Sequence, residues 1–465
     1  MSAYRRAGIR MLHRLHFYAG VLVAPFLLVA AVTGAIYALA PSIENVVYRD
    51  QLHTSETGQS QSLATQVQAA QAVLPGLPVS AVRPPAEAGD TTAVVFDDPT
   101  LGESVRRAVF VDPVTAQTLG DLPVYGSAFA LPVRQWLDHL HRDLHLGDTG
   151  RLYSELAASW LWVITLAGVA LWWTRTRTAR TASRRRKTGR ARTIGRHQTV
   201  GIWVAVGLLF LSATGLTWST YAGEHVTELR SALNWSNPAT DTTLPGMTAT
   251  APAGGEHAEH GGSMSAGGDT SMAVAKVDAA LALARSAGIG DGVEITLPAD
   301  TSTAFTVTEV RSAWQFSPDA AAVDPATDTV VSVNHFADWP VAAKLATWGI
   351  ALHMGLLFGI ANQIVLFVLM LALITIIVLG YRSWFQRHSK RSRVGRAPAS
   401  GALREAPIGL ILAVAVVAVA VGWFIPLLGW PLLAFVVVDV TVGALRARAT
   451  PREPTAPRKD LEEIS

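Results

Sequence analysis

Two copies of one pattern run through this chain, and the duplication restricts its fold more than any other feature. Three groups of residues recur in the same order, at shifts of 181, 212 and 212 positions: His16, Gly20, Thr33 and Gly34 match His197, Gly201, Thr214 and Gly215; Leu140, His141 and Gly147 match Leu352, His353 and Gly359; and Val111-Asp112-Pro113 matches Val323-Asp324-Pro325. Three matches in one order predict two halves built on one plan.

The repeated segments lie within long apolar runs. Half of the 465 residues are hydrophobic and only 16% are charged, and the mean hydropathy is +0.30. A bilayer core requires about 20 apolar residues per helix. Six runs approach that length and are predicted to span a membrane: 15–40, 155–174, 199–220, 357–381, 406–425 and 428–446.

The predicted fold is a membrane α-helical bundle with an internally duplicated four-helix core, a C-terminal hairpin and two small α+β modules on the outer side. The expected division of the chain is the N-terminus and span 1 (1–40), outer module 1 (41–135), span 2 with its preceding histidine motif (136–176), a basic cytoplasmic loop (177–197), span 3 (198–220), a His/Met/Gly-rich linker (221–272), outer module 2 (273–338), span 4 with its histidine motif (339–385), a second basic loop (386–404), the two-span hairpin (405–447) and a cytoplasmic tail (448–465).

Basic residues set the expected orientation. Ten arginines and lysines lie between the second and third runs, within 175–196, and seven more follow the fourth run, within 382–404. Positive residues favour the cytoplasmic side, so both termini are expected there and residues 41–154 and 221–356 outside. Topology and contact with anionic lipid explain the charge better than a nucleic-acid site does. Ala38-Leu39-Ala40 resembles a signal-peptidase site, but the apolar run before it is too long and Pro41 follows it.

The outer segments have the patterns of a helix and short strands in each half. Helices are expected at 63–74 and 274–287, and strands at 79–82, 92–96, 108–111, 293–297, 304–310 and just before Asp324-Pro325. Neither module contains a Ser/His/Asp set, a phosphate-binding loop or a close carboxylate pair, so no catalytic residue is assigned.

The four repeated histidines are the candidate cofactor ligands. His16 and His197 start helices that run outward, whereas His141 and His353 precede helices that run back, so duplication predicts one pair near each membrane face. Two imidazoles that face each other across a pseudo-two-fold axis suit the axial positions of one haem iron. Because the chain has no cysteine, covalent and thiolate-ligated haem and Cys-ligated iron–sulfur clusters are excluded, and two b-type haems are predicted.

The other histidines are less suitable as haem ligands. His13 and His145 lie one helical turn from His16 and His141 and stay open as alternative ligands, but neither has a copy in the other half. His53, His139, His225 and His335 also lack a copy and are interpreted as surface or interface residues. In the linker, His257, His260 and Met264 form a weak copper or zinc motif, whose Gly-rich composition is equally typical of a plain connecting segment.

These motifs resemble the PepSY-associated transmembrane family. The resemblance rests on the H-x-x-x-G…T-G and L-H…L-G spans and on the strand-turn pieces 109–113 and 322–325, and it covers residues 10 to 385. It implies a bacterial inner-membrane protein tied to iron uptake, in a group that includes proteins similar to haem-containing reductases of ferric siderophores. The family histidines fall on His16, His141, His197 and His353; the C-terminal hairpin is extra.

The leading hypothesis is a transmembrane haem b oxidoreductase that passes electrons outward to a ferric siderophore or another metal chelate. No G-x-G-x-x-G strand–helix motif and no long cytoplasmic segment are present, so the electron donor must be separate, either a quinone or a cytoplasmic reductase. The alternative is a non-redox membrane protein that serves a transport system as a metal-binding accessory or a regulator. A homodimer remains open in either case.

Overall fold

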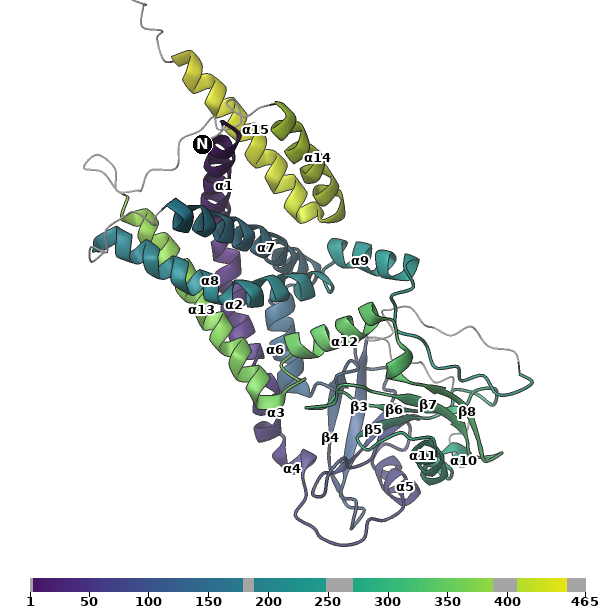
Figure 1. The fold of residues 1–465 in the computed structure, drawn as a ribbon. Coiled ribbons are helices and arrows are strands. Elements are labelled where there is room, and N and C mark those ends of the chain that lie inside the picture. The colour runs from purple at the N-terminus through teal and green to yellow at the C-terminus, as the bar shows by residue number, and fades with distance from the viewer. Residues whose placement is uncertain (1–2, 179–187, 248–270, 388–407, 450–465) are drawn as a thin grey trace, which may run out of the picture. The chain divides into compact units, whose positions relative to one another are not determined.

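Four long apolar segments dominate the helical part of the computed structural model, which describes residues 3–178, 188–247, 271–387 and 408–449 (Figure 1). Helices α7 (Gly147–Thr178), α8 (Gly189–Leu216) and α13 (Gly359–Phe385) are each long and apolar enough to cross a membrane. Helices α1 (Ala3–Leu22) and α2 (Ala24–Tyr37) meet that standard together, as a pair bent by 58°. The described residues therefore contain three candidate spans, or four if the bent pair is one span.

The bend in the first span has a local cause. Pro25 lacks an N–H and cannot bond the carbonyl of Val21, one turn earlier, as an uninterrupted helix requires. The Tyr381 hydroxyl donates to that carbonyl oxygen at 2.8 Å. A carbonyl freed within an apolar span needs such a partner. The predicted span over 15–40 therefore corresponds to two helices that meet at a break next to this proline.

The last two predicted spans are not among the candidate membrane spans of the described residues. Helices α14 (Ile408–Phe424) and α15 (Pro426–Ala449) form a hairpin in which Gly422 and Gly429 let the two backbones approach closely. Their apolar stretches, Ile411–Phe424 and Pro426–Val442, fall below the length required of a candidate span. Six crossings thus remain a prediction.

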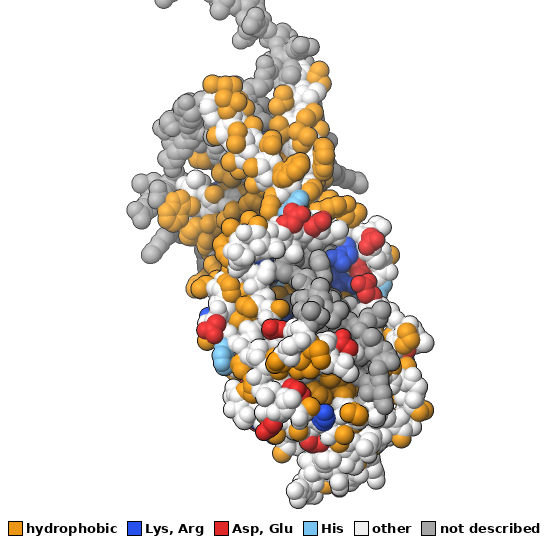
Figure 2. Space-filling view, turned by 90° about the vertical axis from the view of Figure 1, so that its right-hand side faces the viewer, with side chains coloured by type: hydrophobic (Ala, Val, Ile, Leu, Met, Phe, Trp, Pro, Cys, Tyr) orange, Lys and Arg blue, Asp and Glu red, His pale blue; other side chains and the backbone are white. Residues whose placement is uncertain are grey.

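The chain divides into two compact units. Unit 1 comprises Met1–Pro25, Ser159–Ala205 and Ile376–Ser465, and unit 2 comprises Phe26–Ala158 and Val206–Thr375. The sheet and the helices that cover it lie wholly in unit 2. On the face shown in Figure 2, hydrophobic side chains cover the apolar helices, while charged side chains are scattered over the part that carries the sheet.

Strands from both halves of the chain contribute to one antiparallel sheet. Its order is β4-β3-β2-β1-β5-β6-β7-β8, and its strands are β1 (Val79–Arg83), β2 (Thr92–Phe96), β3 (Val105–Val111), β4 (Thr118–Tyr125), β5 (Val293–Thr296), β6 (Phe305–Glu309), β7 (Ala320–Asp324) and β8 (Thr329–Asn334). The central pair joins the halves, with Ala81 opposite Thr296 and Val82 opposite Ile295. The sequence predicted two modules; the structure fuses their strands and adds β4 and β8, which were not expected.

Helices from both halves cover one face of this sheet. Helices α5 (Leu63–Val73), α10 (Ser271–Val274) and α11 (Val277–Ser286) pack there on a shared apolar core whose fully buried members include Phe96, Val67, Val82, Val94 and Ile295. The Asp278 carboxylate of α11 accepts the backbone N–H groups of Leu63 and Ala64 at 2.8 and 3.0 Å. One half therefore caps the first turn of the other half's helix, which favours a single folded body.

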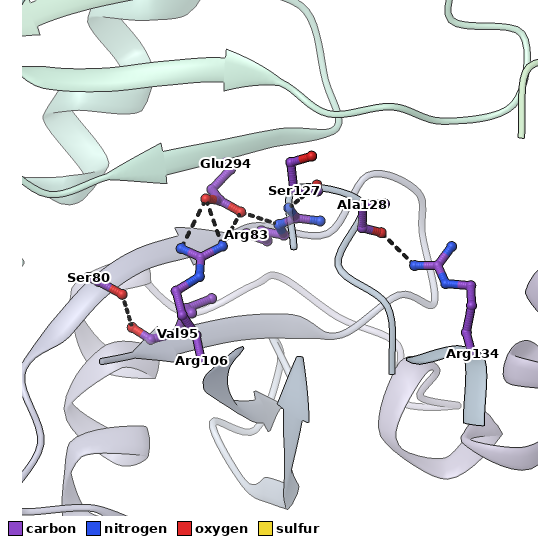
Figure 3. Close-up of polar contacts among 8 residues, drawn as sticks. All are labelled: Ser80, Arg83, Val95, Arg106, Ser127, Ala128, Arg134 and Glu294. Carbon is purple, nitrogen blue, oxygen red and sulfur yellow. Dashed lines mark hydrogen bonds and ion pairs between the residues drawn. The ribbon is translucent and has the colours of Figure 1, made fainter. Parts of the chain in front are cut away.

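An ionic cluster lies at the seam between the halves (Figure 3). Glu294 on β5 accepts from Arg83 Nε at 2.5 Å and from Arg106 Nη2 at 3.2 Å. Burial raises the pKa of Glu294, but the two guanidinium groups outweigh burial and hold the pKa below its usual range. Removing one partner of a buried ion pair costs about 3–5 kcal/mol, so the cluster specifies this strand pairing.

Short helices connect the sheet to the apolar segments of unit 2: α3 (Ala40–Val47), α4 (Arg49–Leu52), α6 (Pro132–Arg142), α9 (Tyr221–Ala232), a 3₁₀ turn (Phe336–Asp338) and α12 (Val341–His353). Glu44 on α3 accepts the N–H of Leu131 at 2.7 Å and pairs with Arg134 at 3.2 Å, which fixes the start of α6. Helix α6 ends one residue after His141, and α12 ends at His353.

Candidate functional site

The structure brings His16 and His197 together in unit 1. His16 lies on α1 and His197 on α8, and their ring centres are 6.2 Å apart with the planes inclined at 74°. We call these two residues pair 1. The sequence predicted this pairing from the repeat alone, since the two positions correspond across the duplication.

Backbone carbonyls orient both rings of pair 1. His16 Nδ1 lies 3.0 Å from the carbonyl oxygen of Ile164 on α7, and His197 Nδ1 lies 3.0 Å from that of Ile376 on α13. A carbonyl can only accept, so Nδ1 carries the hydrogen in each neutral ring and Nε2 keeps its lone pair. Both imidazoles are thus held in the tautomer that binds a metal through Nε2.

Small residues lie beside each ring of pair 1. A Cβ added at Gly168 would come within 3.1 Å of His16 Cε1, and one added at Gly380 would come within 3.7 Å of His197 Cε1. Gly168 and Gly380 are related by the same shift of 212 as Ile164 and Ile376. Each half therefore supplies the same parts: a histidine from its first apolar segment, and a carbonyl and a glycine from its second.

His141 and His353 are neighbours in unit 2, and we call them pair 2. Each ends or nearly ends a short helix, α6 or α12, and both are half-buried. Burial lowers the pKa of His141. Burial, and then the repulsion that a protonated His141 would exert, lower the pKa of His353 to about 3. Two neutral imidazoles therefore lie near one another, as the duplication predicted.

Threonine hydroxyls orient the rings of pair 2. Thr33 Oγ1 lies 3.0 Å from His141 Nδ1, and Thr214 Oγ1 lies 2.6 Å from His353 Nδ1. Each hydroxyl already donates its proton within its own helix, Thr33 to Val29 at 2.9 Å and Thr214 to Phe210 at 2.8 Å. The hydroxyl oxygens must then accept from Nδ1–H, which again leaves Nε2 free.

The glycines of the repeated motifs have distinct structural roles. Gly34, next to Thr33, faces His141 so closely that an added Cβ would lie 2.9 Å from its Cε1. Gly147 and Gly359, which follow the pair 2 histidines, adopt φ of +59° and +54° at the starts of α7 and α13. This left-handed conformation favours glycine, and it lets the chain reverse from each short helix into a long one.

The other sequence candidates are placed differently. His145 packs on Trp136, with ring centres 4.9 Å apart, and lies 6.0 Å from His139, whose Nδ1 contacts the Asp143 carboxylate at 3.1 Å. His53 and His335 form exposed pairs with Asp90 and Asp319, at 3.1 and 2.8 Å. His257, His260 and Met264 lie outside the described residues. His13 is half-buried one turn before His16.

Each pair presents two imidazoles whose Nδ1 atoms are hydrogen-bonded and whose Nε2 atoms keep their lone pairs. Across the ranges that the structure describes, no cluster of three or more histidine, cysteine, aspartate or glutamate side chains could hold a metal ion. A cofactor that brings its own equatorial ligands needs only two axial donors from the protein. Pair 1 and pair 2 each contain two imidazoles, which is that number of donors.

The sequence did not identify the groups that orient the rings. Thr33 and Thr214 carried a signal, because they lie 17 residues after His16 and His197 and each precedes a glycine. Ile164 and Ile376 carried none, since they act through the main chain, which every residue has.

A family model for the PepSY-associated transmembrane region matches residues 13–387. The match includes all four histidines of pairs 1 and 2, both threonines and the whole eight-stranded sheet. Among curated proteins, no relative matches the chain. Since the model covers most of the sequence and the described helices include candidate membrane spans, the chain is a membrane protein that belongs to the PepSY-associated transmembrane family.

Proposed function

We propose that this protein binds haem b and carries electrons outward across the membrane to a ferric chelate. The observation that supports this most directly is the spacing of pair 1. A metal–imidazole bond is about 2 Å long and each ring adds about 1 Å from its nitrogen to its centre, so two rings held on opposite sides of one ion would have centres about 6 Å apart. The 6.2 Å between the ring centres of His16 and His197 fits that requirement.

The protein's own groups prepare these imidazoles as ligands. The carbonyls of Ile164 and Ile376 accept from Nδ1–H, which fixes the tautomer and makes Nε2 more basic. Gly168 and Gly380 leave room next to the rings, where a flat macrocycle would need it. A haem bound here supplies one-electron redox chemistry.

Pair 2 is the proposed second haem site. His141 and His353 have the same free Nε2 atoms, held by Thr33 and Thr214. Burial keeps both rings neutral, as axial ligation requires. One pair in each unit would then give two haems per chain, both non-covalent because the chain has no cysteine.

The direction of electron flow follows from the proposed topology. The basic segments within 175–196 and 382–404 are assigned to the cytoplasm of a bacterial inner membrane, with both termini, and the sheet is assigned to the outer side. Electrons would enter from the reduced form of the quinone pool, a quinol that is oxidised to quinone with release of two protons, or from a cytoplasmic reductase. One electron converts a chelated Fe(III) to Fe(II), which is held less tightly by hard oxygen ligands, so the chelate releases it.

One measurement tests the cofactor and a second tests the substrate. We expect purified protein, expressed with added haem, to show a Soret band, reduced α-bands after dithionite and two haems b per chain. No Soret band under these conditions would remove the proposal and favour a non-redox role. Reduced protein should then be reoxidised by a ferric hydroxamate or catecholate with stoichiometric Fe(II) release, whereas the gallium chelate, which cannot be reduced under these conditions, should leave it reduced.

A further inference from the structure

An aromatic cluster in unit 2 joins a loop of the sheet to the start of an apolar helix. The β6–β7 loop, residues 310–319, carries Trp314 and Phe316, and both rings pack on Phe358, with ring centres 5.2 and 5.6 Å apart. Phe358 immediately precedes Gly359, the first residue of α13. We call Trp314, Phe316 and Phe358 the aromatic cluster.

Hydrogen bonds hold this loop in place. The N–H of Trp314 donates to the carbonyl of Leu357 at 2.8 Å, and the indole N–H of Trp348 on α12 donates to the carbonyl of Phe316 at 2.6 Å. Trp314 adopts φ of +68°, a left-handed conformation that disfavours a bulky side chain. Such a conformation persists only where the surroundings impose it, so the aromatic rings are displayed by a fixed loop.

The displayed rings are exposed although they are apolar. Trp314 is 62% exposed and Phe316 is 39% exposed. Beyond Phe358, α13 carries exposed apolar side chains that include Ile360, Ile364 and Val368 at helical spacing. Because α13 is a candidate membrane span, these side chains form the surface that it would turn toward lipid. The aromatic cluster therefore lies at the end of a lipid-facing surface, where tryptophan is enriched in membrane proteins.

The corresponding turn of the first half lacks these features. The β2–β3 connection, residues 97–104, has the sequence DDPTLGES, with three acidic residues and no aromatic one. Asp98 within it pairs with Arg107 at 2.8 Å. Acidic groups at this position disfavour contact with an anionic membrane surface. The repeated scaffold thus requires no aromatic cluster, and the second half has a specific one.

We propose that the aromatic cluster inserts Trp314 and Phe316 into the lipid headgroup region beside the start of α13, and so anchors the second half of the sheet to the bilayer. The partner is the lipid surface itself. Indole and phenyl rings gain from leaving water while their loop backbone stays at the hydrated boundary. The anchor depends on neither haem nor a chelate, so it can fail or succeed independently of the proposed function.

The absence of native cysteine allows a direct test. Trp314→Cys and, with both aromatic rings kept, Ser312→Cys are labelled with an environment-sensitive fluorophore. The full chain is reconstituted in vesicles of phosphatidylethanolamine and phosphatidylglycerol that contain a headgroup nitroxide lipid. Ile360→Cys is the membrane control, and Gly102→Cys in the exposed β2–β3 connection is the matched control.

We expect blue-shifted emission and strong quenching at positions 312 and 314, close to the loss seen at position 360, and little quenching at position 102. Equal, weak quenching at 102, 312 and 314 would overturn the anchor. Equal, strong quenching at all three would also overturn it, because the contact would then not belong to the aromatic cluster. If Trp314→Cys does not fold, Ser312→Cys decides the result alone.

Discussion

Pair 1 and pair 2 hold their imidazoles in the same tautomer by different means. Main-chain carbonyls accept from the Nδ1 atoms of His16 and His197, whereas the hydroxyls of Thr33 and Thr214 accept from those of His141 and His353. A main-chain carbonyl remains as an acceptor after any side-chain substitution that keeps the helix, whereas a threonine hydroxyl is lost when the side chain is replaced by one without a hydroxyl. Pair 1 is therefore protected against mutation of its supporting residues, and pair 2 is sensitive to it.

The largest expected effect comes from removing the rings themselves. His16→Ala and His197→Ala should each abolish one haem, and so should His141→Ala and His353→Ala, because a haem with one axial imidazole in an apolar site loses most of its protein attachment. Haem per chain, measured by the pyridine haemochrome method, should fall from two to one in each variant. The double variant His16→Ala/His197→Ala should also retain one.

His13→Ala and His145→Ala are the matched controls for that experiment. Each removes a histidine one turn from a proposed ligand, and neither has a counterpart in the other half. Both should keep two haems. If His145→Ala loses a haem while His141→Ala keeps both, the assignment of pair 2 is wrong and the comparison between the pairs fails with it.

A smaller effect, confined to pair 2, is expected from the threonines. Thr33→Val and Thr214→Val keep the shape but remove the acceptor for Nδ1–H; loss of such an outer partner typically costs about 10–100-fold in metal affinity. Haem titration of the apoprotein should show one weakened site and one unchanged site. Thr33→Ser and Thr214→Ser keep a hydroxyl and should bind nearly as well as the parent. Equal weakening of both sites would show that the threonines act through the fold instead.

Sequence reasoning predicted the histidine pairs because a duplication constrains geometry. Residues at equivalent positions of two packed copies meet across the axis that relates them, so the repeat was sufficient to match His16 with His197. The strand positions at 79–82 and 92–96 were also predicted, since short runs of this kind closed by turn residues are typical of strands.

The pairing of strands from different halves could not be read in the same way. β1 and β5 are separated by more than 200 residues, and each would also make a plausible edge strand of its own module. The contacts that decide for one sheet are Glu294 with two arginines and Asp278 at the start of α5. The sequence around a charged residue in a strand does not identify an ion-pair partner that is so distant along the chain.

Two further elements were missed for local reasons. β4 contains Gly120 and Pro123, both unfavourable in strands, and it lies at one edge of the sheet, where such residues are tolerated. The break at Pro25 was hidden within a strongly apolar run, where composition alone predicts one span. The proline was the available signal, and Tyr381, which bonds the freed carbonyl, lies at the far end of another helix.

The smallest expected effect distinguishes the two halves within each pair. A Cβ at Gly34 would lie 2.9 Å from His141 Cε1, but a Cβ at Gly215 would lie 3.9 Å from His353 Cε1. Alanine in a helix is favoured over glycine by about 0.5–1 kcal/mol, whereas overpacking costs about 1–3 kcal/mol. Gly34→Ala should therefore lower stability, because the hydrogen bond to Thr33 prevents the His141 ring from moving away from the added methyl group. Gly215→Ala should leave stability unchanged or raise it.

Thermal unfolding of the two variants in detergent, followed by haem absorbance and by circular dichroism, measures this difference. The same ordering is expected in pair 1, where Gly168→Ala meets His16 at 3.1 Å and Gly380→Ala meets His197 at 3.7 Å. In both pairs the glycine of the first half lies closer to its histidine ring than the glycine of the second half does. The two halves therefore have the same plan but differ in how well they tolerate an added methyl group. Equal destabilisation by Gly34→Ala and Gly215→Ala would mean that the glycines serve helix contact in general and that the ring of His141 is not closely confined.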